Sequence, residues 1–522
     1  MREAAPSIIG WPDPAPVLPA VIVERTQNPT HGDYSVTLPL KLAKPLRRSP
    51  MAIASELAAA MRLPSSFARI AVAAPGFINV TLERGWLQSQ VDFVVSVGEG
   101  WGRSDLGQGV PVQVEFVSAN PTGPLLFSHG RGAVVGDVAA RILEASGFAV
   151  QREYYINDKG KQIRLFGESI RARMLGEPAP EGGYSGAYLS DIAAVLEDNA
   201  LSASAPNLGE LGVEWVQERI WDDLKRLGIR HDQVFLESSL YGGWDEDTMK
   251  RLTGLGRVVE KDGAIWFRTG TEKDEVLFKR DGYPTYFASD IFYHRDKFER
   301  RGFQRVIDVW GADHQGQVGR LKEALRVLDI DPARLTVLMV QLVSVKRGAE
   351  TVRMSRRAGV GVSLREMLDE VGPDAVRYFF LLRSADAQME FDVELAKTQS
   401  GDNPLYYAQY AHARLANVLV LGAGSTGVAA LDRLDSEWEL DLIRIILRWP
   451  DIVKEAAQAI EPHRLAFYTD EVAASVHRFY KNCRVVTDDL TLTAARLQLA
   501  RAARITLANA LGMMGVAAPD RM

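Results

Sequence analysis

The chain has few of the residues that mark oxidising compartments or metal centres. Its 522 residues include a single cysteine, Cys483, which excludes an intrachain disulfide and a CxxC metal site. The eight histidines are scattered without HExxH-type spacing, and we therefore predict no metal centre. These absences suit a protein of a reducing compartment.

Long apolar runs and an excess of basic charge are also missing. No apolar run approaches the length of about 18 residues that a membrane-spanning helix needs. Glu3, Asp13 and Glu24 interrupt the start of the chain, which excludes the apolar core of a signal peptide. We therefore expect a cytoplasmic protein with no membrane partner. Because the net charge is -6, any contact with nucleic acid has to use local basic patches.

The composition itself, with 47% hydrophobic and 25% charged residues, is that of a soluble globular protein. The length predicts about three or four structural units. Residues 1–108 form the first, because a helix starts at Ser49-Pro50 and alternating strands flank the turn Pro75-Gly76. The glycine-rich stretch 98–109 is typical of a linker. We expect this unit to be a separate α+β module.

From residue 109 to 385 the pattern changes to strands that alternate with helices. The strands are expected at 112–117, 149–158 and 305–314. This order predicts an α/β domain with a doubly wound, Rossmann-like parallel sheet, whose ligands bind at the carboxyl ends of its strands. A less regular stretch at about 170–280 indicates an insertion. Residues 386–522 have an almost entirely helical pattern and predict an all-α bundle.

The glycines Gly130, Gly132 and Gly136 open the helix that follows the strand at 112–117. A helix start of this kind can direct backbone N–H groups and the positive end of its dipole at a phosphate. The spacing G-x-G-x-x-x-G is a weak match to a dinucleotide fingerprint. Close packing of the helix on the sheet explains the same glycines, and both interpretations stay open at this point.

Motifs along nearly the whole chain, from ERTQNPTHGDYSV to Met522, decide between them. They read VEFVSANPTGPLLFSHGRGAVVGD, REYYINDKGKQI, YFASDIFYHRDKF, VIDVWGADHQGQ, VRMSRRAGV and GVAAPDRM. In this order they closely resemble the arginyl-tRNA synthetases, a family of class I aminoacyl-tRNA synthetases. The resemblance implies a ligase that activates arginine with ATP and transfers it to the terminal adenosine of its tRNA. It also implies a tRNA-contacting module at 1–108, a catalytic domain at 109–385 and an anticodon-binding domain at 386–522.

Two signatures of the family carry the ATP chemistry, and both are altered here. The His-x-Gly-His signature reads Leu126-Phe127-Ser128-His129, so that only the second histidine is kept. The Lys-Met-Ser-Lys signature reads Arg353-Met354-Ser355-Arg356, in which arginines can neutralise phosphate charge in place of lysines. The resemblance implies His129, Arg353, Ser355 and Arg356 as catalytic residues. It implies Thr122, His129, Gly130, Gly132, His314 and Met354 as ATP-binding residues, with Mg2+ accompanying ATP.

The altered first signature leaves alternatives to a fully active ligase. One is a weakened or inactive synthetase-like paralogue that only binds tRNA, and another is an unrelated nucleotidyltransferase with a single histidine. Charge neutralisation by the arginines of the second signature favours retained activity. We therefore predict a slowed but active enzyme.

A guanidinium is planar and permanently charged, and carboxylates hold it best through paired hydrogen bonds. The resemblance implies Glu115 and Asp290 as these partners, with Tyr286 beside them. Ser118 and Asn120 match positions that hold the amino acid's backbone end. The same residues also have ordinary explanations, a Tyr–Asp pair on a helix surface and simple turn chemistry, although a carboxylate inside VQVEFV needs a cationic partner.

Contacts with tRNA are implied at both ends of the chain. The candidates are Phe77 and Asn79 near the start, and Tyr406, Arg478, Lys481 and Arg484 in the helical region. Cations can meet phosphates there, while aromatic rings stack on unpaired bases. The alternative is a solvated basic face with its aromatic residues in the core. The expected partners are the tRNA for arginine, L-arginine and ATP, and we expect a monomer.

Overall fold

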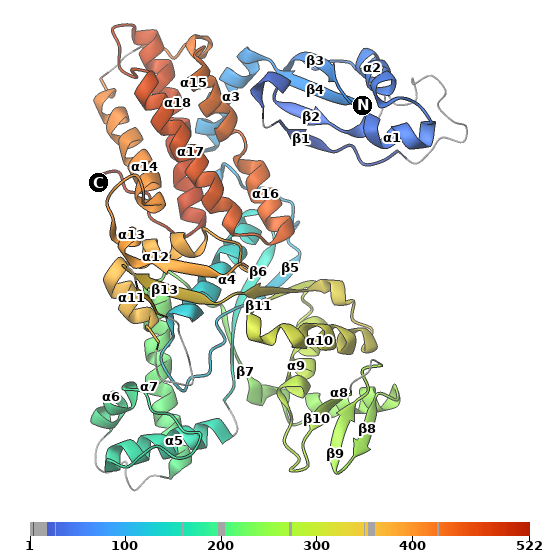
Figure 1. Cartoon of the computed structure of the whole chain (residues 1–522), viewed down its shortest axis with the longest axis vertical. Helices are drawn as coiled ribbons and strands as arrows, with labels where there is room; N and C mark the ends of the chain where they lie inside the picture. Colours follow the sequence, from blue (N-terminus) through green and yellow to red (C-terminus); the bar gives the residue numbers. More distant parts are fainter. Residues whose placement is uncertain are drawn as a thin grey trace. The chain divides into compact units, whose positions relative to one another are not determined.

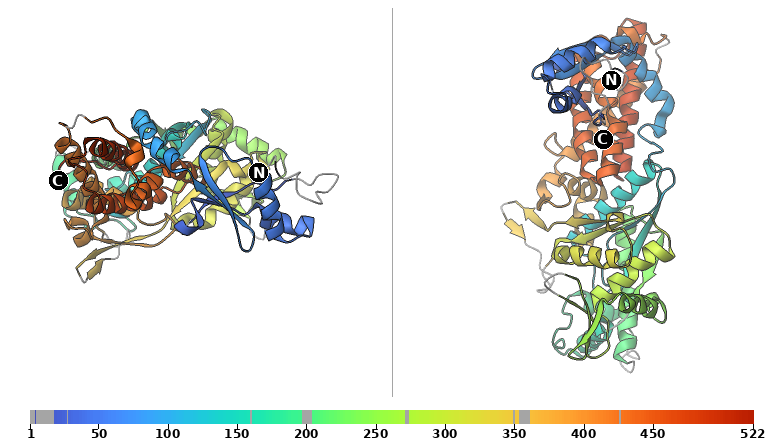
Figure 2. Two further views of the ribbon diagram at one scale, coloured as in Figure 1. Left: turned by 90° about the horizontal axis from the view of Figure 1, so that it is seen from above. Right: turned by 90° about the vertical axis from the view of Figure 1, so that its right-hand side faces the viewer.

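The computed structural model describes residues 4, 18–26, 28–158, 161–196, 204–270, 274–348, 350–352, 361–424 and 427–522. These residues form two compact units. The first contains Met1–Glu99, Leu415–Leu447 and Ser475–Ile505, and the second contains Gly100–Arg414, Arg448–Ala474 and Thr506–Met522. Three long helices that run alongside one another contribute a part to each unit (Figures 1 and 2): α14 Pro404–Leu421, α17 His463–Asn482 and α18 Leu490–Met513.

An antiparallel sheet with the order β1-β2-β4-β3 begins the first unit (Figure 1). Its strands are β1 Val23–Arg25, β2 Tyr34–Val36, β3 Phe67–Ala73 and β4 Phe77–Leu82, and it packs with α1 Leu38–Leu46 and α2 Pro50–Ala60. Gly76, between β3 and β4, has φ 151° and approaches α2 so closely that a Cβ would lie 2.5 Å from Pro50 Cβ. The predicted helix and strand pair are both present.

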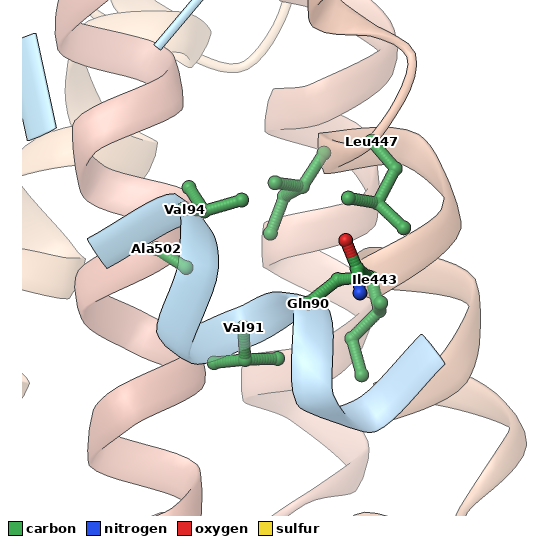
Figure 3. Close-up of a pocket in the computed structure, with 7 residues that line it drawn as sticks. Gln90, Val91, Val94, Ile443, Leu447 and Ala502 are labelled. Carbon is green, nitrogen blue, oxygen red and sulfur yellow. The ribbon is translucent and has the colours of Figure 1, made fainter. Parts of the chain in front are cut away.

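Helix α3, Arg84–Val97, packs against α15, Glu437–Ile446, within the same unit. The carboxylate of Glu83 caps α3 by accepting a hydrogen bond from Trp86 N at 2.7 Å. A narrow apolar gap between the helices is lined by Gln90, Val91, Val94, Ile443, Ile446, Leu447 and Ala502 (Figure 3). The gap has no room for a water-sized molecule, so it is a packing seam.

The second unit is built on a five-stranded parallel sheet with the order β12-β11-β5-β6-β7 (Figure 1). Its strands are β5 Pro111–Glu115, β6 Ala149–Ile156, β7 Gln233–Leu236, β11 Arg305–Gly311 and β12 Leu335–Val340. The strand order reverses between β5 and β11, where ligands bind in sheets of this kind. The predicted doubly wound sheet is therefore confirmed, and it points to the ends of β5 and β11 as the site.

Further helices and two separate three-stranded sheets belong to the second unit. The helices are α4 Phe127–Ala145, α5 Lys161–Leu175, α6 Tyr188–Val195, α7 Ala205–Arg226, α8 Trp244–Gly254, α9 Tyr286–Arg295, α10 Gln315–Val327, α11 Leu364–Val371, α12 Pro373–Phe380, α13 Val393–Lys397 and α16 Trp449–Ala459. One small sheet contains β8 Val258–Lys261, β9 Ala264–Phe267 and β10 Glu275–Phe278, and the other contains β13 Val343–Arg347, β14 Glu350–Val352 and β15 Met389–Asp392. The stretch 170–280, expected to contain an insertion, thus holds four helices or parts of helices, strand β7 and the first small sheet.

Two local expectations differ from the structure. The helical pattern expected over 386–522 is interrupted before Trp449-Pro450, between α15 and α16, because proline lacks the amide hydrogen that a continuous helix needs. The glycine-rich stretch 98–109 is packed, because Trp101 is only 8% exposed and its carbonyl accepts a hydrogen bond from Trp449 Nε1 at 2.9 Å. No helix of the described part of the chain is long and apolar enough to cross a membrane.

Candidate functional site

Charged side chains meet at the carboxyl ends of the central parallel strands. Glu115 ends β5, Asp308 lies opposite it in the register of β11, and Glu237 follows β7 directly. All three are at most 8% exposed. Carboxylates buried to this degree need cations or hydrogen-bond donors, and the partners of each one show what the site can still bind.

The loop that leaves β5 is held in an unfavourable backbone conformation. Val117 and Ser118 have φ values of 71° and 38°, in the left-handed region that side chains with a Cβ avoid. Ser118 Oγ donates to Glu115 Oε1 at 2.9 Å and accepts from Tyr155 N at 3.1 Å. Asn120 is exposed in the same loop. Strain of this kind persists where surrounding contacts fix it, and it is common at functional sites.

A lysine of the chain neutralises Glu115. Lys297 Nζ lies 2.6 Å from Glu115 Oε2 and 2.8 Å from Asp308 Oδ1, and the lysine is fully buried. His294 Nε2 lies 2.6 Å from Asp308 Oδ2. Burial opposes ionisation of Asp308, but Lys297 and His294 outweigh it and hold the pKa of Asp308 at about 2.

This arrangement changes the expected role of Glu115. Sequence reasoning required a cation for a carboxylate inside the strand and assigned the guanidinium of arginine to it. In the structure both Glu115 oxygens are engaged, one by Lys297 and one by Ser118. Lys297, His294 and Asp308 were missed, although "YHRDKF" and "VIDVW" carry them, because only the tertiary fold brings the two segments together.

Asp290 differs from the other acids of this cluster. It lies on α9 one turn after Tyr286, and no hydrogen bond or ion pair joins its carboxylate to the described part of the chain. Burial raises the pKa of Asp290 to about 7; His294 opposes this rise, and Glu115 and Asp308 add to it. Tyr286 is 62% exposed and its hydroxyl accepts from Gln162 Nε2 at 3.2 Å. The α9 pair expected from the sequence is therefore present, with Asp290 at the cluster and Tyr286 at its rim.

Glu237 is a second acid that sequence reasoning missed. Its Oε1 accepts from Tyr241 Oη at 2.9 Å and from Ser289 Oγ at 3.0 Å. Its Oε2 is buried, with no donor in hydrogen-bond geometry among the described residues. Burial raises the pKa of the Tyr155 phenol, and the charges of Glu237 and then Asp290 raise it further. Tyr155 therefore lies beside both acids.

The first signature forms the start of α4. His129 Nδ1 accepts a hydrogen bond from Leu126 N at 2.9 Å, so the proton of the neutral ring lies on Nε2. Phe127 N donates to Val362 O at 3.0 Å, and Gly361 lies so near Leu126 that a Cβ would be 3.2 Å from its side chain. The segment that follows the second signature is thus bound to the first signature. Leu126 supplies an apolar contact in place of the family's histidine.

The glycines of α4 serve different purposes. A Cβ on Gly130 would lie 2.9 Å from Leu364, so this glycine is explained by helix packing. A Cβ on Gly132 would meet nothing nearer than Val309 at 3.8 Å, and Gly132 is partly exposed. Gly136 packs against Phe116 in the same manner as Gly130. The packing interpretation thus accounts for the buried glycines.

The other expected ATP-binding residues differ in how exposed they are, and some of them lie outside the described residues. Thr122 is 9% exposed, and its carbonyl accepts from Tyr188 Oη at 2.7 Å. The His314 side chain is 49% exposed at the start of α10, beyond the carboxyl end of β11. Arg353, Met354, Ser355 and Arg356 lie outside the described residues. Among the described residues no group of three or more histidine, cysteine or carboxylate side chains is placed to hold a metal ion.

At the end of α17 the two aromatic residues of the motif differ. Arg478, Lys481 and Arg484 are exposed there, and Phe479 is fully buried in the core, whereas Tyr480 is 37% exposed. Arg478 Nη2 lies 3.1 Å from Asp441 Oδ2, a pair in which both partners are nearly half exposed. Phe479 is therefore structural, and the cations and Tyr480 face solvent.

On α14 three side chains form a stacked column. The rings of Tyr406 and Tyr410 lie 5.9 Å apart at 15°, and Arg414 lies 4.6 Å above the Tyr410 ring. Tyr410 is 37% exposed. A partly exposed aromatic surface with a guanidinium on it is suited to stacking with an unpaired base.

The N-terminal candidates lie on β4. Phe77 begins the strand and is partly exposed. Asn79 is 8% exposed and lies between Ser35 and Ala71 in the sheet register. The structure therefore presents the aromatic ring to solvent more than the amide.

Comparisons with known proteins follow this geometry. A model described as the arginyl tRNA synthetase N terminal domain matches residues 3–82, and one described as the DALR anticodon binding domain matches residues 408–522. The arginine–tRNA ligase of Dehalococcoides mccartyi strain CBDB1 is 46% identical over 524 residues, 96% of this chain and 94% of that relative. The arginine–tRNA ligase of Moorella thermoacetica is 45% identical over 530 residues, 97% of this chain and 94% of that relative.

A solved structure gives the same likeness in three dimensions. The arginyl-tRNA synthetase of Thermus thermophilus matches with a TM-score of 0.80 at 24% identity, covering 100% of both chains. At this identity the match shows a shared fold.

Proposed function

This chain belongs to the arginyl-tRNA synthetase family, and from that premise we propose how its own residues perform the family's reaction. As an ATP-dependent arginine–tRNA ligase it activates arginine and transfers it to the 3' terminal adenosine of its tRNA. The alternative of an inactive tRNA-binding paralogue is not supported by relatives named arginine–tRNA ligase at this identity and coverage.

The observation that carries the proposal is the charge of the buried cluster. Glu115 and Asp308 share Lys297 and His294, whereas Asp290 has no ion pair with the described residues. A guanidinium supplies one permanent positive charge and donors on several sides. We assign its first contact to Asp290, and its second to Glu237, which lies beside Tyr155, with Tyr286 closing the pocket.

The backbone end of arginine is then assigned to the strained loop after β5. Ser118 is fixed by Glu115 and Tyr155, and the exposed Asn120 follows it. In this arrangement Glu115 orients Ser118 and does not contact the guanidinium. The amino-acid carboxylate is left facing the start of α4, where ATP is assigned.

ATP is assigned to the N-terminal end of α4. His129 Nε2 donates to phosphate, Gly132 has no Cβ and is partly exposed, and Thr122 and His314 border the nucleotide. Arg353, Met354, Ser355 and Arg356 contribute by their resemblance to the second signature. Mg2+ arrives on the phosphates of ATP and supplies further neutralisation of their charge.

The reaction proceeds in two steps, activation of arginine and its transfer to tRNA. An oxygen of the arginine carboxylate bonds to the α-phosphorus as the bond to pyrophosphate breaks, and pyrophosphate leaves with the electron pair. A ribose hydroxyl of the terminal adenosine then attacks the arginyl carbonyl carbon, loses its proton and releases AMP. His129 and the arginines of the second signature stabilise the charge that develops on the phosphates.

Contacts with tRNA are proposed on three surfaces. They are Phe77 with Asn79, the column of Tyr406, Tyr410 and Arg414, and the cations Arg478, Lys481 and Arg484. Residues 1–108, 109–385 and 386–522 serve as tRNA-contacting module, catalytic domain and anticodon domain. We further propose that the protein acts as a monomer in the cytoplasm.

Arginine-dependent exchange of labelled pyrophosphate into ATP tests the proposed function. The unmodified protein should catalyse exchange with arginine, and lysine should not replace it, because an ammonium lacks the planar fork that joins two acids. The assay is run with and without tRNA. Absence of exchange in both conditions, with tRNA binding retained, would assign the chain to the inactive alternative.

A further inference from the structure

Lys297 lies in the only segment of the described residues that has π-helical geometry. This segment, η6, spans Asp296–Arg300 and continues α9 without a break. Because a π-helical turn is wider than an α-helical turn, side chains after α9 point in other directions than they would if the α-helix continued. Such segments are common at functional sites. Lys297 is its second residue and is fully buried. The local geometry thus places a lysine where burial is most costly.

The lysine is integrated into a cluster from several elements. Its Nζ contacts Glu115 of β5 and Asp308 of β11, and lies 4.1 Å from the centre of the Tyr293 ring. Burial lowers the pKa of Lys297, but the nearby carboxylates outweigh it and raise the pKa above its ordinary value. Lys297 is therefore a permanent cation within the site.

His294 is the second partner of Asp308 in the cluster. Its Nδ1 lies 2.7 Å from the backbone carbonyl oxygen of Asp290, and its Nε2 faces the Asp308 carboxylate. Lys297 is thus shared by Glu115 and Asp308, and Asp308 has a further partner in His294. Asp290 and Glu237 have no ion pair with the described part of the chain.

We propose that Lys297 is a positioning residue for arginine: by pairing with both Glu115 and Asp308, it leaves Asp290, which has no ion pair of its own among the described residues, to receive the substrate guanidinium beside Glu237. This inference rests on the proposed role of Asp290. It adds a residue that does not touch arginine and yet determines whether the pocket carries the charge that arginine needs.

The ionisation of Asp290 shows how this works. His294 and Lys297 lower its pKa, whereas Glu115 of β5 and Asp308 of β11 raise it. Other charged or titratable groups packed around the cluster are Glu153 and Tyr155 on β6, Glu237 after β7, Tyr293 on α9, Asp296 on η6 and Arg301 directly after it. Glu153 is paired with Arg301 Nη1 at 2.5 Å, and so carries little unbalanced charge. Loss of Lys297 would leave Glu115 unbalanced and hold Asp290 in its neutral form.

The test is the pH dependence of L-arginine binding, measured by equilibrium dialysis with labelled arginine. Lys297→Met should weaken arginine binding at pH 7 about fivefold and move the midpoint of the pH profile upward by about one unit, since a nearby charge shifts a pKa by this order. Lys297→Arg, which keeps the charge, should keep the midpoint. ATP binding should change less than twofold in both variants.

A second variant separates this role from a purely structural one. Lys297→Met combined with Glu115→Gln removes the cation and its partner, keeps an acceptor for Ser118, and should return the midpoint to that of the unmodified protein. If Lys297→Met does not fold, Glu115→Gln alone replaces it in the comparison. Glu115→Gln should lower the midpoint, and adding Lys297→Met should raise it again. The inference would be overturned if Glu115→Gln and the double variant had the same midpoint. It would also be overturned if Lys297→Met folded and kept the midpoint of the unmodified protein.

A matched control is Arg152→Met. Arg152 is 2% exposed and lies 2.5 Å from Glu144, on the strand position next to Glu153, so its side chain lies on the opposite face of β6. This variant should lower the melting temperature without moving the arginine midpoint. Asp290→Asn separates a failure of the proposed pocket from a failure of the role of Lys297. If Asp290→Asn binds arginine as well as the unmodified protein, the proposed pocket itself is wrong. If Asp290→Asn binds arginine weakly but Lys297→Met keeps the unmodified midpoint, only the role of Lys297 is wrong.

Discussion

The end of the parallel sheet and the end of α17 both combine arginine or lysine with aspartate, with different consequences. Lys297 and Asp308 are fully buried and joined at 2.8 Å, whereas Arg478 and Asp441 are nearly half exposed and joined at 3.1 Å. Removing one partner of a buried pair typically costs about 3–5 kcal/mol, and an exposed pair contributes about 0–1 kcal/mol. The difference shows that burial determines how much binding free energy depends on each charge.

The largest effect is expected at Asp290, in the buried cluster. Asp290→Asn should raise the arginine concentration needed for half-maximal exchange several hundredfold, because the guanidinium loses a charged partner in a buried site. ATP binding should not change. The matched control is Asp329→Asn, whose side chain is 90% exposed and lies near Arg251. Equal arginine affinity in Asp290→Asn and the control would remove the buried cluster from amino-acid recognition.

The next effect concerns His129, at the start of α4. His129→Ala removes one hydrogen bond to a charged phosphate, which costs about 1.5–3 kcal/mol. The rate of pyrophosphate exchange should therefore fall about ten- to a hundredfold, with little change in arginine affinity. Single-turnover formation of the adenylate measures this step directly. An unchanged rate would show that the remaining cations bind ATP without this histidine.

The exposed side of the comparison predicts a smaller effect. Replacing Arg478, Lys481 and Arg484 by Gln should weaken tRNA binding roughly tenfold and reduce the slope of log affinity against log salt by up to about 2, because each phosphate contact contributes about 0.7 to that slope on single strands. Arginine and ATP affinity should stay the same. A full salt slope in the triple variant would identify these cations as a solvated face.

The smallest effect is expected for the altered signature itself. Leu126→His with Ser128→Gly adds a possible donor to phosphate, but it also removes the apolar contact between Leu126 and Gly361. The activation rate should rise less than tenfold, since one hydrogen bond is gained and one contact is lost. A rise of several hundredfold from an inactive protein would instead indicate a decayed site.

The sequence was sufficient for the fold, and it predicted the site at the carboxyl ends of the parallel strands. Periodicity placed β5, α4 and β11, and the parallel order then brought their ends together. It was also right that Glu115 needs a cation, a requirement that follows from burial alone. It did not predict that Lys297 is this cation, because the π-helical turn that directs the lysine inward depends on tertiary packing.

Other residues show where periodicity has limits. Phe479 lies among cations in the sequence, and only the packing of α17 shows that it is core. Gly130 and Gly132 are two positions apart and equivalent in the motif, yet a Cβ on Gly130 would lie 2.9 Å from Leu364, whereas a Cβ on Gly132 would lie at an ordinary contact distance of 3.8 Å from Val309. Glu237 follows an ordinary short strand, and nothing in its neighbours distinguishes it from a surface glutamate. Such distinctions depend on which face of an element meets another part of the chain.

The central claim is that Asp290 is the carboxylate reserved for the guanidinium, and the pH dependence of L-arginine binding to the unmodified protein tests it most directly. Asp290 has a pKa of about 7 in the free protein and binds a permanent cation only when ionised. Arginine binding should therefore strengthen as pH rises, reach a plateau above about pH 7, and weaken progressively below it. Asp290→Asn should bind weakly with no such dependence. Binding of the unmodified protein that is independent of pH between about 5.5 and 8.5 would contradict the account.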